Sequence, residues 1–371
     1  MARKNPFEMF MEDPTRSVPQ IIAKIEKNYN APAYSLRNLF KDFTGEVNLK
    51  NRIDYRLTTD EGKLGIPRMQ VRGAATEETM RVRKKSDVYL DVPHYKQSGA
   101  LRADDFLGKV EENTAPEMIY DTIENSLAER FTTSWDDYTV LDEYNYACSV
   151  LGLVRDGLSV DAINIYRRLN AKQKVFELDL ESKSYNPYID TRYINSYISK
   201  ALSGTISTKR VGVCSGSFWD RLITNKYLME TYRYEGSAFL REHHLEGYNF
   251  MDIEWMVYDN ETLDAKGNVF KWIPDGDAYV IPYGVSDLFM NVNAPADTMP
   301  EVMQEAKHRY SNYWLKDDKR TIELETQTNT ITFCSRPESI VRLTIKGYKP
   351  KRTFEDTFVP PVLPEERREN Q

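Results

Sequence analysis

The sequence predicts an α+β fold in which extended segments are organised around one long helix. Residues 134–156 carry apolar side chains at helical spacing, with Ser134 as a cap at the start and Gly157 as a stop at the end. Three strand-like segments, 320–328, 330–336 and 339–347, follow one another near the C-terminus. A third observation is the extended, locally basic stretch 47–92, which has no apolar core of its own. A helix of about 20 residues spans roughly 30 Å and offers sheets a surface to pack on.

Composition excludes several classes of protein. The chain has 371 residues with a net charge of −7, so a protein whose main affinity is for nucleic acid is not expected. Cys148, Cys214 and Cys334 lie far apart, which predicts neither a disulfide framework nor a zinc site and fits a reducing compartment. No apolar run is long enough for a membrane span, and the N-terminus lacks the apolar region of a signal peptide.

Residues 1–45 are predicted to form an N-terminal arm. Prolines interrupt this region, and 20–28 reads as a short helix. Its apolar side chains are too sparse for a core, so the arm either docks on another surface or remains a mobile tail. We expect a docked arm that is not cleaved off.

Residues 46–100 are predicted to form an extended basic loop, folded as a hairpin with flanking strands. Ile53, Tyr55 and Leu57 alternate with polar residues, as in a half-buried strand. An isolated two-stranded hairpin is barely stable in water, so this loop should lie on a neighbouring copy of the chain. The candidate intersubunit residues are basic: Arg68, Arg72, Arg81, Arg83, Lys84 and Lys85.

Three interpretations of this basic cluster remain open. It pairs with an acidic surface on another subunit, forms a solvated loop, or contacts nucleic acid. The last has the weakest support, because few aromatic residues are interleaved with the basic ones and Glu77, Glu78 and Asp87 dilute the charge.

The rest of the chain alternates between strand and helix patterns. A capping box at 114–117 starts a helix that precedes the long one, with a break at 132–134. The remaining expected elements are paired strands 162–168 and 172–180, a helix 186–204, a strand, turn and helix over 209–230, strands within 248–283, a helix 300–315 and a proline-broken tail 349–371.

One motif suggests an enzyme. Residues 212–216, with Cys214 at their centre, match a cysteine version of the nucleophile elbow of α/β hydrolases. A soluble hydrolase would also need an acid, Asp252 or Asp277, and a base, for which His308 is the candidate. The repeated strand–helix units of that fold are missing, so a turn that needs small residues is the simpler interpretation.

No metal or cofactor site is expected. The adjacent His243 and His244 do not share one face of a helix, and the zincin spacing is absent. Asp275 and Asp277 flank Gly276 without the further oxygen ligands of a calcium loop, which is typical of a turn.

The order of arm, basic loop, long helix, mixed region and final strands resembles the lambda-type major capsid proteins of tailed bacteriophages. Three stretches carry the resemblance, and they cover most of 45–350: IPRMQVRGAATEETMRV at 66–82, ACSVLGLVRDG at 147–157, and DGDAYVIPYG at 275–284, which is followed by NAPAD and SRPESIV. The arm 1–45 and the tail 349–371 depart from the family pattern.

The resemblance implies the Hong Kong 97-type capsid fold and a structural, non-catalytic protein. It implies a peripheral domain that holds the long helix 134–156, here 101–185 plus 300–348, and an axial domain, here 186–299. Hexamers and pentamers would build an icosahedral head around double-stranded DNA, with scaffolding, portal and decoration proteins as further partners. The expected location is the virion, after assembly in the host cytoplasm.

Overall fold

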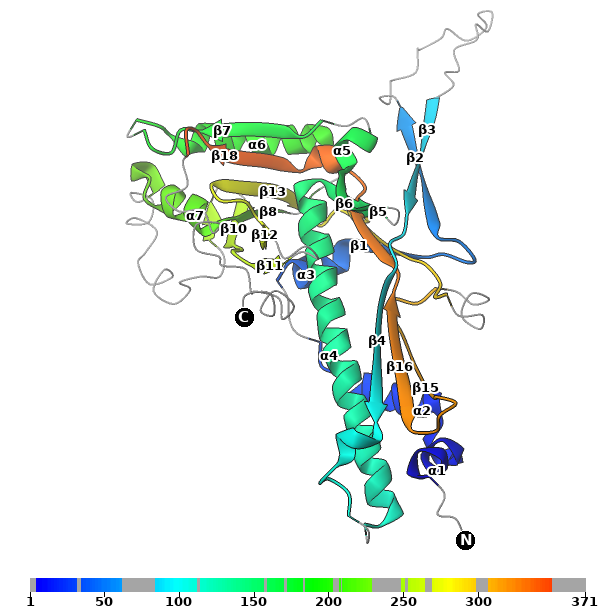
Figure 1. Cartoon of the computed structure of the whole chain (residues 1–371). Helices are drawn as coiled ribbons and strands as arrows, with labels where there is room; N and C mark the ends of the chain where they lie inside the picture. The colour runs from blue at the N-terminus through cyan, green and yellow to red at the C-terminus, as the bar shows by residue number, and fades with distance from the viewer. Residues whose placement is uncertain are drawn as a thin grey trace, which may run out of the picture.

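One long helix, α4 (Pro116–Leu151), runs from one end of the molecule into its centre in the computed structural model (Figure 1). The structure describes residues 5–31, 35–61, 84–111, 114–156, 159–169, 172–182, 184–202, 207, 209–228, 248–250, 253–263, 269–297 and 306–348.

The bounds of α4 correct the prediction of two helices. The helix begins at Pro116 and continues through 132–134 without a break, for 36 residues in all. Ser134 is not a cap, because it lies in the middle of the helix and is buried in the protein. Its hydroxyl forms a hydrogen bond with the hydroxyl of Thr326. Gly152, with a φ of 75°, ends the helix in the left-handed conformation, so the chain leaves it before the predicted end at 156.

The upper part of the molecule is a six-stranded sheet. Its order is β7 (Lys174–Leu178), β18 (Val341–Ile345), β13 (Asp277–Tyr283), β8 (Lys209–Cys214), β10 (Ile253–Val257) and β9 (Tyr248–Phe250). Helices α6 (Pro187–Ala201) and α7 (Gly216–Ile223) share a core with this sheet and with the last turns of α4. The sheet therefore crosses the boundaries expected between the two domains, because β7 and β18 come from the segments assigned to the peripheral one.

The lower part packs on the other half of α4. A three-stranded antiparallel sheet has the order β15 (Tyr310–Leu315), β16 (Thr321–Thr328) and β4 (Tyr95–Arg102). The helix expected at 300–315 is wrong for its last six residues, which form β15. Tyr310 and Tyr313 are three residues apart, a helical spacing, but pairing with β16 and burial of both rings decide the conformation.

The remaining strands form smaller sheets. The strands β1 (Thr44–Asn48), β14 (Phe289–Asn293) and β17 (Thr330–Cys334) form one of them. Antiparallel pairs are formed by β2 (Asp54–Glu61) with β3 (Lys84–Asp91), by β5 (Leu153–Asp156) with β6 (Ser159–Asn164), and by β11 (Glu261–Leu263) with β12 (Val269–Lys271). The pairing expected between 162–168 and 172–180 is wrong, because β6 pairs with β5, β7 pairs with β18, and α5 (Ile165–Arg168) separates them.

The N-terminal arm docks on its own chain. Its helices are α1 (Pro6–Glu12), α2 (Val18–Asn28) and α3 (Ser35–Phe40). Phe7, Phe10 and Ile21 are buried in one core with residues of α4, β15 and β16. Arg16 adds ion pairs to Asp121 at 2.8 Å and Glu124 at 3.1 Å. The expected docked arm is thus confirmed for the described residues, and its helix at 20–28 is α2.

Short 3-10 turns complete the fold. They are η1 (Pro14–Arg16), η2 (Lys41–Phe43), η3 (Ala103–Phe106) and η4 (Pro337–Ser339). The expected helix 186–204 corresponds to α6, capped by Asn186, and the three C-terminal strand patterns correspond to β16, β17 and β18.

The glycine that ends α4 gives a test of the fold. A Cβ at Gly152 would meet the ring of Tyr166 at 1.8 Å, whereas one at Gly108, with a similar φ of 76°, would meet nothing within 4 Å. We expect Gly108→Ala to cost about 1–2 kcal/mol for the left-handed backbone alone. Gly152→Ala should cost about 1–3 kcal/mol more, from overpacking. Urea unfolding of the isolated chain measures both losses, and equal losses would contradict the packing described here.

Candidate functional site

Where the upper and lower parts meet, α4 carries a buried carboxylate that faces one histidine and two arginines. Asp142 is 3% exposed, and its Oδ2 accepts a hydrogen bond from Nε2 of His308 at 2.9 Å. Guanidinium groups of Arg309, at 3.3 Å, and of Arg37, at 3.6 Å, face the same oxygen. Burial opposes ionisation of Asp142, but His308 and the two arginines outweigh it and hold its pKa below the ordinary 3.8. The arm, the helix and the segment before β15 are joined at this carboxylate.

The next residue, Glu143, holds two further segments. Its carboxylate accepts hydrogen bonds from the backbone N–H groups of Leu36 and Arg37, both at 2.9 Å, at the start of α3. It also accepts one from the hydroxyl of Tyr258, which follows β10. Burial raises the pKa of Glu143 against the effect of these donors. We call Asp142, Glu143 and their partners the polar joint.

The polar joint gives a second prediction. Asp142→Asn leaves two arginines without their buried counter-charge and should cost about 3 kcal/mol at pH 7. Because the folded pKa of Asp142 is lowered, its contribution is present above 3.8 and is lost as the pH falls through the folded pKa. The difference between variant and wild type should therefore shrink between pH 7 and pH 3 in urea unfolding.

Asp121→Asn is the matched control, because Asp121 pairs with Arg16 but its side chain is 63% exposed. It should cost less than about 1 kcal/mol. A loss of that small size for Asp142→Asn as well would show that the polar joint does not hold the segments together.

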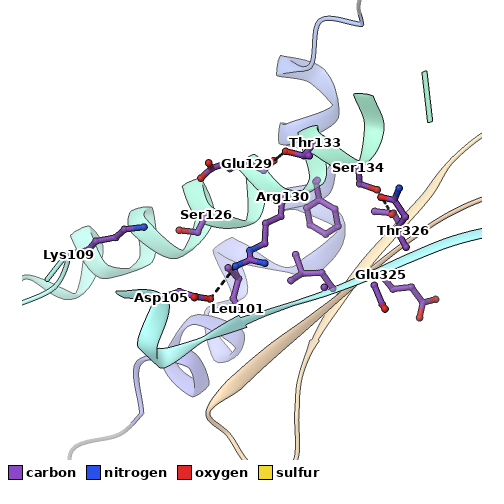
Figure 2. Close-up of a pocket in the computed structure, with 15 residues that line it drawn as sticks. Leu101, Asp105, Lys109, Ser126, Glu129, Arg130, Thr133, Ser134, Glu325 and Thr326 are labelled. Atoms are coloured by element: carbon purple, nitrogen blue, oxygen red, sulfur yellow. Dashed lines mark hydrogen bonds and ion pairs between the residues drawn. The ribbon is translucent and has the colours of Figure 1, made fainter. Parts of the chain in front are cut away.

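A groove of about 460 Å³ lies between α4 and β4 (Figure 2). Leu101, Phe131 and Leu324 contribute its apolar lining, and Ser126, Glu129 and Thr133 of α4 are among its polar residues. At one end Arg130 pairs with Asp105 at 3.2 Å, and at the other Ser134 bonds Thr326 (Figure 2). Sequence patterns did not indicate this groove, which depends on how a strand and a helix pack.

The hairpin predicted within 46–100 is confirmed where the structure describes it. β2 and β3 pair from Asp54↔Asp91 to Glu61↔Lys84 and stand away from the body (Figure 1). Of the six candidate intersubunit residues, Lys84 and Lys85 belong to β3, paired with Glu61 and Asp60. The other four, Arg68, Arg72, Arg81 and Arg83, lie outside the described residues. Their role in contacts between subunits stays a prediction.

The hydrolase candidates that the structure describes are engaged in other contacts. Cys214 is fully buried, its Sγ donates to the carbonyl of Met256, and burial raises its pKa, which disfavours the reactive thiolate. The base candidate His308 is engaged by Asp142, and the carboxylate of Asp277 by Arg342 at 2.6 Å. Asp252 lies outside the described residues. The glycine-rich motif is the turn from β8 into α7, as the simpler interpretation held.

Among the residues that the structure describes, no group of His, Cys, Asp and Glu side chains is placed to hold a metal ion. His243 and His244 fall outside these residues, while Gly276, with a φ of 76°, forms the expected turn. None of the helices described combines the length and hydropathy that a membrane span requires.

Comparison with known proteins identifies the family. The model of a family described as phage major capsid protein E matches residues 17–345, well over half of the chain. The chain belongs to this family. As a member of the capsid protein E family it is 24% identical, over 179 residues, to the major capsid protein of Pseudomonas phage KPP10. That match covers 45% of this chain and 51% of the relative, so the chain spans about half the length of the curated relative.

Solved structures support the fold of this family member. A putative capsid protein of a prophage of E. coli CFT073 is similar over 88% of this chain and 98% of its own, with a TM-score of 0.55 at 13% identity. The mature capsid of bacteriophage PhiM1 is similar over 86% and 89%, with a TM-score of 0.53 at 12% identity. The chain thus has the Hong Kong 97-type capsid fold, an α+β fold, as the sequence resemblance implied.

Proposed function

We propose that this chain is the structural major capsid protein of a phage, which assembles as hexamers and pentamers into an icosahedral head around double-stranded DNA. The observation that carries the proposal is the family match over 17–345, which includes α4, both large sheets and the hairpin. The protein performs no catalysis. Its place is the virion, after assembly in the host cytoplasm, with scaffolding, portal and decoration proteins as partners.

The two parts of the molecule take the two roles of a shell subunit. The peripheral domain comprises 101–185 plus 300–348, and the axial domain comprises 186–299. β7 and β18 join the sheet of the axial domain, so the two domains are coupled through shared strands as well as through α4. The arm is retained in the mature particle, where it covers the lower half of α4.

The net charge of −7 suits a container for DNA, because a basic inner wall would hold the genome by its phosphates.

Electron microscopy of the purified chain tests this function against the hydrolase alternative. Closed particles are expected. Monomers and small oligomers alone, together with esterase activity that Cys214→Ala removes, would instead support the enzyme.

The hairpin of β2 and β3 makes the contact between subunits. Ile53, directly before β2, and Tyr89 of β3 are large hydrophobic residues that are 69% and 55% exposed. The loop between its strands is locally basic on an acidic chain, and its charges pair with carboxylates of the adjacent subunit. One exposed ion pair contributes only about 0–1 kcal/mol, but several pairs repeated over a shell decide whether assembly occurs.

Reversal of three of these charges gives a third prediction. The triple variant Arg81→Glu, Arg83→Glu and Lys85→Glu should remain folded, since surface charges rarely control a fold. Its particle yield in sedimentation should fall at least tenfold, and high salt should partly reproduce the loss. The matched control, Arg81→Lys, Arg83→Lys and Lys85→Arg, keeps every charge and should assemble. A normal particle yield for the triple reversal would contradict this role and support the interpretation of the loop as a solvated hairpin.

A further inference from the structure

Helix α6 carries an exposed apolar patch. Ile189 and Tyr193 are large hydrophobic residues, yet they are 59% and 63% exposed. They lie four positions apart and therefore share one face of the helix, while Ile194 and Ile198 are buried on another. Single exposed apolar side chains are common on protein surfaces, but neighbouring ones form a patch that suits an interaction.

The polarity of this face changes along the helix. Ser196 and Lys200 continue the helical spacing after Tyr193, and both are exposed. Tyr197, which is half-buried, lies one turn beyond Tyr193 and adds a second aromatic ring. We call Ile189 and these four residues the α6 face. It is apolar and aromatic near the start of α6 and basic near its end.

The chain leaves the described fold close to the end of β7. β18 ends at Ile345, and the next residue, Lys346, donates its backbone N–H to the carbonyl of Leu178 at 3.0 Å. Leu178 is the last residue of β7, and α6 begins nine residues later at Pro187. The tail 349–371 therefore starts at the end of the sheet from which the chain also enters α6.

From this end of the sheet, α6 runs back along the two strands. The ring of Tyr197, in the second half of the helix, lies 6.5 Å from the ring of Phe176 in β7, centroid to centroid. α6 also contacts η4, which precedes β18 and so lies at the opposite end of that strand. In Figure 1, α6 accordingly lies along β7 and β18. The first turns of α6, with Ile189 and Tyr193, are thus the part of the helix nearest to the start of the tail.

The sequence of the tail has the same order of properties as the α6 face. Residues 349–371 lie outside the described residues, and 349–357 contain both charged and apolar side chains. Residues 358–364, FVPPVLP, are apolar throughout, and their three prolines favour the extended polyproline II conformation. Glu365 and Glu366 follow directly. An apolar segment is thus followed by two acidic residues, as the apolar part of the α6 face is followed by Lys200.

We propose that residues 358–364 dock on the α6 face of their own chain, with Glu365 and Glu366 beside Lys200. Proline-rich segments in the polyproline II conformation bind surfaces lined by aromatic side chains, because the preformed extended helix loses little conformational entropy. The rings of Tyr193 and Tyr197 supply such a surface. Docking also removes the apolar patch from water, which is favourable.

The lengths of the two segments agree. α6 has 15 residues and is about 22 Å long at 1.5 Å per residue. Seven residues of polyproline II span about 22 Å at ~3.1 Å per residue. The nine residues 349–357 reach up to about 30 Å at ~3.3 Å per residue, which is longer than α6 itself. A segment tethered this closely has an effective concentration of roughly millimolar, which favours the tail of the same chain over that of a second copy.

Hydroxyl-radical footprinting of the dilute, unassembled chain tests the docking. In the double variant Val362→Asp and Leu363→Asp, oxidation of Ile189 and Tyr193 should rise at least threefold over wild type, because charged side chains do not cover an apolar patch. Leu107, which is 78% exposed in the lower part of the molecule, is the internal control and should be oxidised equally in both proteins. Equal oxidation of Ile189 and Tyr193 in the two proteins would overturn the proposal.

Cross-linking identifies the chain that supplies the tail. The three native cysteines are buried, so Ser196→Cys and Leu363→Cys introduce the reactive thiols. In dilute solution, a short bis-maleimide should join these two positions within one chain. The matched control is Thr224→Cys with Leu363→Cys, because Thr224 is exposed next to Asn225, whose side chain donates to the carbonyl of Tyr185 before α6 at 3.3 Å. An undocked tail reaches both positions, whereas the docked tail should give the control pair a yield at least fivefold lower.

The cross-linking outcomes separate docking within one chain from its alternatives. Links that join only two different chains, or equal yields for the two cysteine pairs, would overturn the proposal. Neither experiment requires particles, so their results do not depend on the proposed capsid function.

Discussion

The buried carboxylates of Asp142 and Glu143 set the constraint on which the rest of the structure depends. They lie on α4 where the core of the six-stranded sheet ends and the core shared by the arm, β15 and β16 begins. A buried carboxylate is tolerated only when donors surround it, and here the donors come from α3, from Tyr258 and from the segment before β15. Satisfying these two side chains fixes three stretches of chain against one helix.

Much of the fold could be predicted from the sequence, and the errors of that prediction have physical causes. Strands with clear alternation, such as β16, and helices with a capping residue, such as α6 after Asn186, were found because the signal is local. The start of α4 was placed at Ser134 because serine is a common cap, but its hydroxyl finds Thr326 far along the chain, and the helix continues. The sheet that unites β7 and β18 with β8 depends on tertiary pairing, which no local pattern reports.

The candidate functional site, too, could be predicted from the sequence only in part. The basic loop and its hairpin were predicted, because charge clusters and alternation are visible in a single sequence. The polar joint and the groove were not predicted, because both form where segments distant in sequence meet. The sequence also does not show that the space beside Gly99 is open. The motif around Cys214 was visible for a different reason: Gly212 lies where a Cβ would meet the ring of Trp255 at 2.5 Å, so packing and not chemistry requires the glycine.

The central proposal is that this chain holds three packed cores and a hairpin that a neighbouring copy completes. The root of the hairpin packs into the body through Leu90 and Tyr55, but its outer half relies on exposed contacts such as Thr58 to Asp87 at 2.8 Å. Hydrogen exchange of the β2 and β3 amides, compared between the unassembled subunit and assembled particles, tests this most directly. The account predicts fast exchange in the subunit and strong protection in particles, with β8 and β13 protected in both. Equal exchange of the hairpin amides in the two states would contradict it.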